Sequence, residues 1–349
     1  MKIKRGLTLG KYAPLHQGHQ LVIDTALSEM DEVIVIIYDS PSTTNVPLSV
    51  RAGWLKSLYP QVTVIEAWDG PETVGYTPEK MRMHEAYVIE TLKIRDISHF
   101  YSSEPYGDHM SRALGAVNRM VDRPRTAVPV SASAIRQNAF RYREFMHPLV
   151  YRDLIANIVF MGAPCTGKTT LAQQLAREYQ TQWMPEFGRE YWEKHQVNRQ
   201  LSREQLVEIA EGHIEREDKL LLESNRFLFT DTNAITTLTF SRYYHGETLP
   251  RLIELADRAV TRYDLVFLCD TDIPYEDTWD RSGEVNREAF QRQVVSDLVV
   301  RKIPFIWLRG SLDRRIKRVR QILDHYEKYT NVADLFIKEN DNGGGDSHA

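Results

Sequence analysis

A short glycine-containing segment near the middle of the chain constrains most strongly what this sequence can fold into. Residues 160–170 read FMGAPCTGKTT, in which one glycine is followed by four residues and then by Gly-Lys-Thr. This spacing is typical of a phosphate-binding loop (P-loop), because glycines let the backbone close around an anion at the start of a helix. The flanks agree with this interpretation: residues 156–161 predict a buried strand, and residues 171–176 predict an amphipathic helix.

Individual residues of this loop have separate expected roles. We expect Lys168 to reach the β- and γ-phosphates of a nucleotide, and the hydroxyl of Thr169 to bind Mg²⁺. The backbone around them is expected to form an anion-binding nest. The predicted phosphate-binding residues are Gly162, Ala163, Pro164, Cys165, Thr166, Gly167, Lys168, Thr169 and Thr170.

Chain length and composition bound the domain organisation. The 349 residues predict two domains, because a P-loop domain begins with a strand and leaves residues 1–150 as a domain before it. The second domain is expected at residues 151–330, followed by a disordered tail at 331–349. A hydrophobic content of 42% supports packed cores, and a net charge of −4 gives no bulk attraction to nucleic acid or to a membrane surface.

Cysteine usage and the absence of targeting signals predict a cytoplasmic protein. No apolar run approaches the roughly 18 residues of a membrane span, and the N-terminus lacks the apolar core of a signal peptide. The chain has two cysteines, Cys165 in the P-loop and Cys269 at a predicted strand end. A disulfide between them would obstruct the phosphate site, so both are expected to be reduced thiols.

Two histidines, His16 and His19, stand between a predicted strand at residues 2–9 and a predicted helix at residues 19–30. The apolar run at residues 32–38 completes a strand–helix–strand unit. Imidazoles three residues apart at a helix start converge with backbone N–H groups on one point, which suits a triphosphate. A metal pair and a pair of helix-capping histidines are the alternatives that the residues leave open.

The surroundings of these histidines resemble a known family. Residues 10–19 (GKYAPLHQGH) resemble the HxGH signature of nucleotidyltransferases, and residues 130–136 (VSASAIR) resemble their second signature. With residues 135–142 (IRQNAFRY) and the P-loop that follows, the combination resembles the bifunctional nicotinamide-nucleotide adenylyltransferase/ribosylnicotinamide kinase family over residues 3–325. Some members carry an N-terminal helix-turn-helix domain, and the early first strand implies that this domain is absent here.

This resemblance implies an α/β protein with two doubly wound parallel-sheet domains, a Rossmann-like nucleotidyltransferase domain followed by a P-loop kinase domain. His16, His19 and Arg136 would hold the triphosphate of ATP during direct adenylyl transfer, with release of pyrophosphate. Lys11 would contact the phosphate of the acceptor, and Ser131 would be one of the additional phosphate donors. The full set that the resemblance implies for the phosphates is Gly10, Lys11, His16, Gly18, His19, Ser131, Ser133 and Arg136.

One loop departs from the family pattern. The family usually has a Gly-Trp followed by another Trp at the nicotinamide pocket, whereas residues 67–76 read AWDGPETVGY. Trp68 or Tyr76 could stack on a nicotinamide ring, and a core position for Trp68 is the alternative. Arg51 matches a family position that faces the site, with a solvated surface arginine as its alternative. Ligands bind at the carboxyl ends of parallel strands, so residues 103–104 are expected to contact adenosine or ribose: Ser103 and Glu104.

Two carboxylates of the second half are candidates for catalysis. Glu186 ends a predicted strand at residues 182–186, so it could accept the proton of a substrate hydroxyl, while Arg189 would hold substrate or phosphate. A surface ion pair between these two is the alternative. Asp231 ends an apolar strand, which is the usual place for a Mg²⁺-water ligand or a ribose contact. Which of the two carboxylates is the base stays open.

A long polar loop at residues 270–283 resembles the lid of nucleoside and nucleotide kinases. Arg281 would neutralise charge on the transferred phosphoryl group when such a lid closes. Tyr275 or Trp279 would stack on the nicotinamide. The basic residues 313–320 are interpreted mainly as a solvated helix face.

The leading hypothesis is an NAD salvage enzyme. The second domain would phosphorylate ribosylnicotinamide with MgATP, and the first would join the product, nicotinamide mononucleotide (NMN), to AMP, giving NAD. One alternative is adenylyl transfer to another phosphorylated acceptor. Another is a nucleotide sensor, although Glu186 and the lid favour a kinase. The expected partners are these small molecules, without nucleic acid or membrane, and a homo-oligomer is compatible with the sequence.

Overall fold

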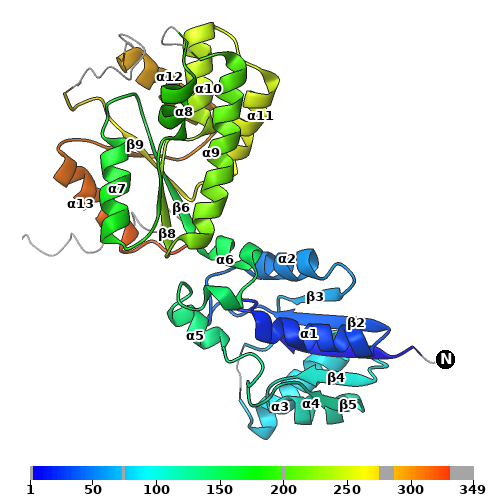
Figure 1. The fold of residues 1–349 in the computed structure, drawn as a ribbon. Coiled ribbons are helices and arrows are strands. Elements are labelled where there is room, and N and C mark those ends of the chain that lie inside the picture. The colour runs from blue at the N-terminus through cyan, green and yellow to red at the C-terminus, as the bar shows by residue number, and fades with distance from the viewer. Residues whose placement is uncertain (1–2, 73–74, 198–200, 275–286, 331–349) are drawn as a thin grey trace, which may run out of the picture. The chain divides into compact units, whose positions relative to one another are not determined.

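The computed structural model describes residues 3–72, 75–197, 201–274 and 287–330 (Figure 1). The chain divides into two compact units, Met1–Tyr151 and Arg152–Ala349. Each unit contains a five-stranded sheet in which every strand pair is parallel. The α/β fold with two parallel sheets that the sequence predicted is therefore confirmed.

The sheet of the first unit has the strand order β3-β2-β1-β4-β5. Its central strand β1 pairs with β2 on one side and β4 on the other, so the connections leave β1 in two directions. β2 lies where the apolar run predicted it, but the edge strand β5, which is mostly exposed and has no apolar run, was not predicted. The strands are β1 (Arg5–Gly10), β2 (Glu32–Tyr38), β3 (Thr63–Ala67), β4 (His99–Ser102) and β5 (Val117–Met120).

Some helices of the first unit begin at a side-chain cap. The side chain of Thr77 accepts a hydrogen bond from the N–H of Lys80 and is followed by a proline, as the sequence predicted. The helix that starts there continues as a π-helical segment, Tyr87–Thr91. The helices are α1 (Gln17–Glu29), α2 (Leu48–Leu58), α3 (Pro78–Ala86), α4 (Gly107–Leu114), α5 (Ala132–Gln137), a 3₁₀ turn (Arg143–Phe145) and α6 (Pro148–Leu154).

The sheet of the second unit has the order β10-β9-β6-β8-β7. Its three inner strands are buried at every position, because helices cover both faces of a parallel sheet. Phe160 of β6 stacks between Phe229 and Phe267 of the neighbouring strands, with ring centroids 6.2 and 5.7 Å apart. The strands are β6 (Ala156–Met161), β7 (Trp183–Met184), β8 (Phe227–Asp231), β9 (Leu265–Cys269) and β10 (Ile306–Leu308).

Helices lie on both faces of this second sheet (Figure 1). α7 and α13 pack on one face, in a core that includes Leu171 and Val319. α9, α10, α11 and α12 pack on the other, in a core that includes Ile209 and Phe290. The helices are α7 (Lys168–Glu178), α8 (Phe187–His195), α9 (Arg203–Glu223), α10 (Ala234–His245), α11 (Pro250–Arg258), a 3₁₀ turn (Ala259–Thr261), α12 (Arg287–Val300) and α13 (Leu312–Leu323).

Three expectations for the second unit need correction or fall outside the described residues. The strand expected at residues 182–186 is only two residues long, because its polar end turns directly into α8. The helix face expected to be solvated at residues 313–320 contains a buried arginine, Arg315. The predicted lid residues Tyr275, Trp279 and Arg281, and the tail at 331–349, lie outside the part of the chain that the structure describes.

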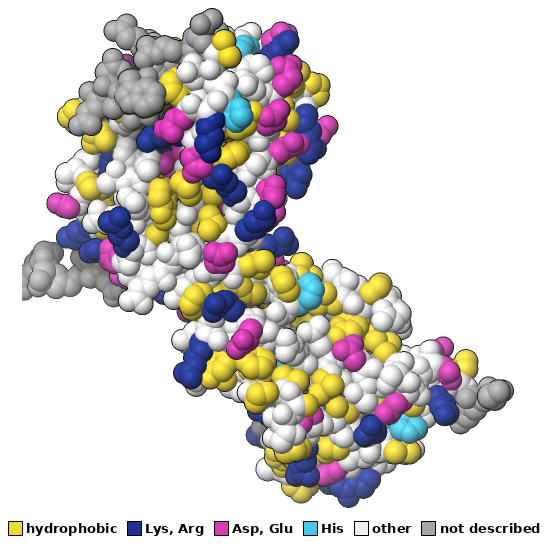
Figure 2. Space-filling model, in the orientation of Figure 1, with side chains coloured by type: hydrophobic (Ala, Val, Ile, Leu, Met, Phe, Trp, Pro, Cys, Tyr) yellow, Lys and Arg dark blue, Asp and Glu magenta, His cyan; other side chains and the backbone are white. Residues whose placement is uncertain are grey.

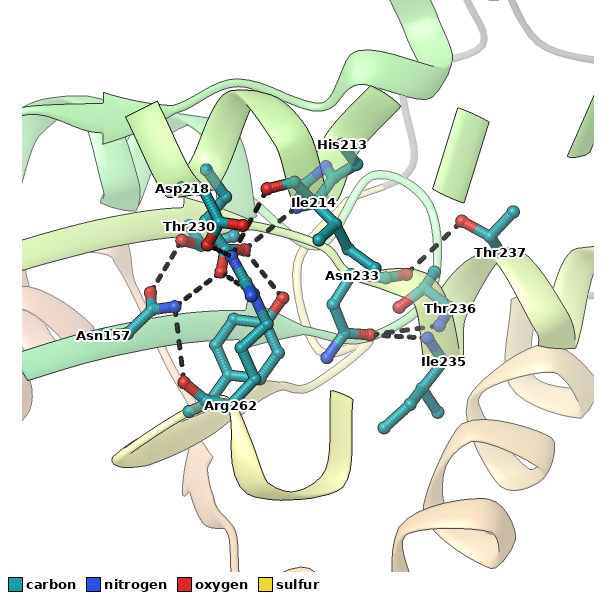
Figure 3. A network of polar contacts seen from close by, with 12 residues as sticks. Asn157, His213, Ile214, Asp218, Thr230, Asn233, Ile235, Thr236, Thr237 and Arg262 are labelled. Carbon is teal, nitrogen blue, oxygen red and sulfur yellow. Dashed lines mark hydrogen bonds and ion pairs between the residues drawn. The ribbon is translucent and has the colours of Figure 1, made fainter. Parts of the chain in front are cut away.

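A buried polar network supports the sheet at the amino-terminal end of β6 (Figure 3). The amide of Asn157 accepts from the hydroxyl of Thr230 at 3.0 Å and donates to the carboxylate of Glu217 at 2.7 Å. Burial alone would raise the pKa of Glu217, but the adjacent His213 and the charge of Arg262 keep this pKa below its usual value. The carboxylate is therefore a paired internal charge that fixes α9 against the sheet.

The outer surface shown in Figure 2 carries charges of both signs, interspersed over the visible face. This mixture fits the small net charge of −4. None of the described helices is both long and apolar enough to cross a membrane. Cys165 and Cys269 are not joined by a disulfide, as the sequence predicted.

Candidate functional sites

Each sheet has one point where the chain reverses its direction of winding, at the central strands β1 and β6. Ligands of open parallel sheets bind at the carboxyl ends of the strands next to such a point. The predicted phosphate-binding residues of the two halves follow these two strands, at residues 10–19 and 162–170. The structure therefore has two candidate sites, and each is built within a single unit.

The first candidate site contains the histidine pair at the start of α1. His16 is the N-cap residue, and its Nδ1 accepts the N–H of Gly18 at 3.1 Å. The rings of His16 and His19 stack with centroids 3.8 Å apart, and Tyr12 packs edge-on against His19 at 4.9 Å. Because Nδ1 of His16 accepts, the proton of its neutral ring is on Nε2, which makes that atom a hydrogen-bond donor.

Burial keeps both histidines neutral. Desolvation, and then the positive charge of Arg125, lower the pKa of His16 to about 4. The pKa of His19 is lowered by burial, by His16 and by Arg125. The two rings therefore act as neutral donors in the free protein, and a bound polyanion would favour their charged forms. Among the described residues, no group of three His, Cys, Asp or Glu side chains is arranged to hold a metal ion.

Cations gather at the segment between β1 and this histidine pair. Arg136 of α5 donates to the carbonyl of Ala13 at 2.6 Å and to the hydroxyl of Ser133 at 3.1 Å. Lys11 donates to the hydroxyl of Thr43 at 2.9 Å. Burial, and then the charges of Arg136 and Arg51, lower the pKa of Lys11. The segment after β1 thus has a positive electrostatic potential, which favours the binding of an anion.

Arg51 is fully buried, so the alternative of a solvated surface arginine is wrong. Its guanidinium donates to the backbone carbonyls of Lys11, Tyr38 and Val46, and it contacts the carboxylate of Asp39 at 3.3 Å. These contacts use most of the five N–H groups of an arginine. Arg51 therefore supports the loop that carries Lys11, and its direct contact with substrate stays a prediction.

The predicted base-stacking residues are exposed. Trp68 directly follows β3 and is 56% exposed, which makes the alternative of a core position wrong. Tyr76 is 57% exposed. Both rings have surface to offer a flat ligand, and their contact with nicotinamide stays a prediction.

The remaining predicted contacts of the first unit lie at strand ends and helix starts. Ser103 and Glu104 follow β4, while Gly10 ends β1. Ser131 is the N-cap of α5, and its hydroxyl accepts the N–H of Ala134 at 3.2 Å. In that position the hydroxyl is already used as a capping acceptor, and its proton is left to donate to a phosphate.

Sequence analysis gave no role to Arg125. Its guanidinium donates to the carboxylate of Glu104 at 2.6 Å, and its charge lowers the pKa of both histidines. The loop that carries it is held by Asp122, whose carboxylate accepts three backbone N–H groups. No spacing in the sequence connects residue 125 to the histidines, because their proximity depends on the tertiary fold.

The second candidate site is the P-loop between β6 and α7. Gly162 has φ of 135°, and a Cβ there would lie 2.5 Å from the carbonyl oxygen of Cys269. Gly167, the N-cap of α7, has φ of 80°. Only glycine tolerates such positions without strain, so the local sequence determines the shape of the loop. The first N–H groups of α7 have no acceptor within the helix and can bind an anion.

Within this loop Lys168 is buried and donates to the carbonyl of Ala163 at 2.9 Å. Thr166 donates to the same carbonyl at 2.8 Å, and the N–H of Ala163 donates to Gln291 of α12 at 2.7 Å. The N–H of Ala163 is therefore used inside the protein, and Pro164 has no N–H. The donors left for a phosphate include the N–H groups at the start of α7, from Gly167, Lys168, Thr169 and Thr170.

Asp231 lies beside this loop, at the end of β8. Its Oδ2 accepts a hydrogen bond from the hydroxyl of Thr169, whereas the buried Oδ1 has no hydrogen-bond partner. Burial, and then the negative charge of Glu186, raise the pKa of Asp231 to about 6. Asn233, labelled in Figure 3, caps α10 two residues later and fixes the chain after Asp231.

These residues fit a Mg²⁺ ion. Mg²⁺ in nucleotide sites is held by one or two protein oxygens, phosphates and water. The hydroxyl of Thr169 and the unpartnered Oδ1 of Asp231 supply such oxygens next to the anion-binding N–H groups. A bound divalent cation would also remove the cost of keeping this carboxylate charged in a buried place.

Glu186 is the N-cap residue of α8, and Arg189 lies one turn later, with 3.7 Å between Nη2 and Oε2. Both side chains are partly exposed. The ion pair that was the alternative interpretation is therefore present. It does not exclude a role in the reaction, because Glu186 is close enough to Asp231 to raise its pKa.

Comparisons with known proteins show what each part of the chain is similar to. The AAA domain family matches residues 157–315. The trifunctional NAD biosynthesis/regulator protein NadR of Salmonella typhimurium is 29% identical over 343 residues, covering 91% of this chain and 82% of that protein. The NadR protein of Escherichia coli is 27% identical over 321 residues, covering 86% of this chain and 78% of that protein. The chain is thus similar to NadR proteins over most of its length.

The solved structures and a shorter relative support this placement. A NadR structure in complex with NR has a TM-score of 0.56 and 22% identity, covering 94% of this chain and 98% of that one. A probable nicotinate-nucleotide adenylyltransferase of Thermotoga petrophila is 24% identical and covers 45% of this chain and 96% of that protein. The resemblance inferred from the HxGH and P-loop signatures is confirmed, and the NadR fold extends over nearly the whole chain.

Proposed function

We propose that this protein makes NAD from ribosylnicotinamide in two ATP-dependent steps. The second unit phosphorylates the 5′-hydroxyl of ribosylnicotinamide, giving NMN and ADP. The first unit transfers AMP from ATP to NMN, giving NAD and pyrophosphate. One observation carries this proposal. The chain has a histidine pair after β1 and a P-loop after β6, and it is similar to NadR over 91% of its length.

For phosphoryl transfer, the second unit supplies position and charge compensation. The N–H groups at the start of α7 and the ammonium of Lys168 would bind the phosphates, which requires Lys168 to leave the carbonyl of Ala163. Thr169 and Asp231 would hold Mg²⁺, which would supply positive charge to neutralise the phosphates. These roles leave Glu186, which is partly exposed, as the acceptor of the proton of the substrate hydroxyl.

For adenylyl transfer, the first unit needs no general base. The phosphate of NMN is already ionised at neutral pH, so it can attack the α-phosphorus of ATP directly. The charge that develops on the leaving pyrophosphate would be stabilised by donors from His16, His19 and Arg136. Lys11, the further cation of this cluster, would bind the phosphate of NMN.

Two exposed aromatic side chains, Trp68 and Tyr76, support an acceptor that contains nicotinamide. A flat aromatic ligand gains dispersion and electrostatic energy from such rings. A nucleotide sensor, the alternative from another class of protein, needs no carboxylate at Glu186 beside Asp231. All partners in this proposal are small molecules, without nucleic acid or a membrane surface, and both reactions occur in the cytoplasm.

The two products ADP and pyrophosphate separate the two activities in one protein. With ribosylnicotinamide and MgATP the wild type should release ADP, and Lys168→Ala should release none. With NMN and MgATP it should release pyrophosphate, and His19→Ala should stop this reaction. Each variant is the control for the other, because Lys168→Ala should keep adenylyl transfer and His19→Ala should keep kinase activity. A wild type that releases neither product would show that the proposal is wrong.

A further inference from the structure

Arg315 of α13 is buried, with 2% of its surface exposed, although Arg314 and Lys317 on the same helix are exposed. Taking a guanidinium out of water costs free energy unless its charge and its N–H groups find partners inside the protein. Neither of the two proposed reactions assigns this residue a role. The hydrogen bonds of its guanidinium show which segments this residue connects.

The guanidinium of Arg315 connects three loops at the carboxyl end of the second sheet. Nη1 donates to the carbonyl of Thr166 in the P-loop at 2.7 Å. Nε donates to the carbonyl of Gly310, in the turn after β10, at 2.9 Å. Nη2 donates to the carbonyl of Asp270 at 3.1 Å and to the carboxylate of Asp272, both in the segment after β9.

The contact with Thr166 determines the direction of a phosphate-binding group. The carbonyl of Thr166 and the N–H of Gly167 belong to the same peptide unit, which is planar and trans, so they point in opposite directions. Arg315 holds the carbonyl on the protein side of the loop. The N–H of Gly167, at the start of α7, is therefore directed away from the protein interior, where an anion can accept it.

The partner carboxylate Asp272 is also fixed. The N–H of Gly310 donates to it at 2.6 Å, and Arg315 forms its ion pair. Burial alone would raise the pKa of Asp272, but the N–H of Gly310 and the charge of Arg315 keep it below its usual value. The pair is therefore charged at neutral pH, and it holds the beginning of the segment after β9 against the P-loop.

We propose that Arg315 is a positioning residue for the kinase reaction, which directs the N–H of Gly167 toward the phosphates of ATP and ties the P-loop to the segment after β9. The inference rests on the proposed kinase function of this loop. It predicts an effect on ATP and not on ribosylnicotinamide, because the hydrogen bonds of Arg315 reach the P-loop and the segments after β9 and β10.

Steady-state kinetics of full-length variants test this role. ADP release reports the kinase alone, because adenylyl transfer releases pyrophosphate. Arg315→Ala should raise the KM for ATP by about tenfold to a hundredfold, the loss that one charge-assisted hydrogen bond represents. The kcat and the KM for ribosylnicotinamide should change less than about threefold, because a backbone donor to phosphate binds ground and transition states similarly. The KM for ATP of Arg315→Lys should lie between those of the wild type and Arg315→Ala, since lysine keeps the charge but loses the directed N–H groups.

Three controls separate positioning from general damage. Lys317→Ala removes the same charge from an exposed position of the same helix and should match the wild type. Pyrophosphate release from ATP in the presence of NMN should be unchanged in every variant. Added guanidinium ion should lower the raised KM for ATP in Arg315→Ala and have no such effect on the wild type.

An unchanged KM for ATP in a folded Arg315→Ala protein would overturn the proposal. Equal losses for ATP and ribosylnicotinamide would also overturn it, since they indicate structural damage alone. If Arg315→Ala does not fold, Asp272→Asn replaces it. That variant removes the ion-pair partner at a half-buried position and should raise the KM for ATP by about twofold to tenfold, and no change there would overturn the proposal. A wild type without ADP release would instead contradict the proposed function itself.

Discussion

At the scale of single residues, Asp231 combines a cost in stability with a role in binding. Its side chain is fully buried, one carboxylate oxygen has no hydrogen-bond partner, and Glu186 adds negative charge nearby. A fold selected for stability alone would place a neutral side chain here. The carboxylate is useful only if a cation or a donor arrives, which is what a nucleotide-bound Mg²⁺ provides.

This cost gives a prediction about stability and pH. The pKa of Asp231 is about 6 in the folded protein and about 3.8 when unfolded, so the folded state holds the proton more tightly. The proton bound to Asp231 therefore stabilises the folded state below pH 4. This contribution to the free energy of unfolding, on the order of 3 kcal/mol, is lost as the pH rises through 6. Asp231→Asn cannot lose a proton, so it should be more stable than the wild type at pH 7 and equal to it near pH 4.

Thermal unfolding in EDTA without nucleotide, repeated from pH 4 to pH 8, measures this difference. Other titrating groups are common to both proteins and cancel in the comparison. The asparagine should also abolish ADP release while leaving pyrophosphate release intact. A variant that is less stable than the wild type by the same amount at every pH would contradict the assigned charge and pKa of Asp231.

At the scale of elements, both sites are assembled at the amino-terminal ends of helices. His16 caps α1, Ser131 caps α5, Gly167 caps α7 and Glu186 caps α8. A helix start offers unpaired N–H groups and positive potential, so phosphate-binding residues and capping residues occupy the same positions. The alternative interpretation of the histidines as helix caps is therefore correct for His16, and it is compatible with phosphate binding.

A cap away from both sites tests how much a helix start contributes to stability by itself. Ser202 and Gln205 form a capping box at the start of α9, the longest helix of the second unit among the described residues. Ser202→Ala should lower the free energy of unfolding by about 0.5–2 kcal/mol and leave both activities unchanged. Chemical denaturation measures the loss. Glu215→Ala, which removes only an exposed ion pair of the same helix, should cost less than about 0.5 kcal/mol.

Elements with strong periodicity were predictable, and contacts between distant segments were not. The strands Glu32–Tyr38 and Ala156–Met161 coincide with their apolar runs because they are buried in parallel sheets. β5 escaped this signal, and β7 is shorter than the strand predicted at residues 182–186, since edge strands need few apolar side chains. The burial of Arg315 within a basic run depends on which loops the fold brings together, and so does the position of Arg125 near the histidines. The charge pattern alone predicts that Arg315 is exposed to solvent.

At the scale of the whole molecule, the described residues of each candidate site belong to a single unit. The histidine pair, Lys11 and Arg136 all belong to Met1–Tyr151, whereas the P-loop, Glu186 and Asp231 all belong to Arg152–Ala349. In the proposed function, the product of the second unit, NMN, is the substrate of the first. A variant that has lost one site should therefore still perform the other reaction in full.

Complementation between two inactive chains tests this independence. Neither Lys168→Ala nor His19→Ala alone should make NAD from ribosylnicotinamide and MgATP, because each lacks one step. An equimolar mixture should make NAD after a lag, during which NMN accumulates in solution to the level that the first unit needs. The lag should shorten as the concentration of the His19→Ala protein rises, since that protein supplies the NMN. If the mixture makes no NAD while both single reactions proceed, the two sites must act within one chain, and their independence would be contradicted.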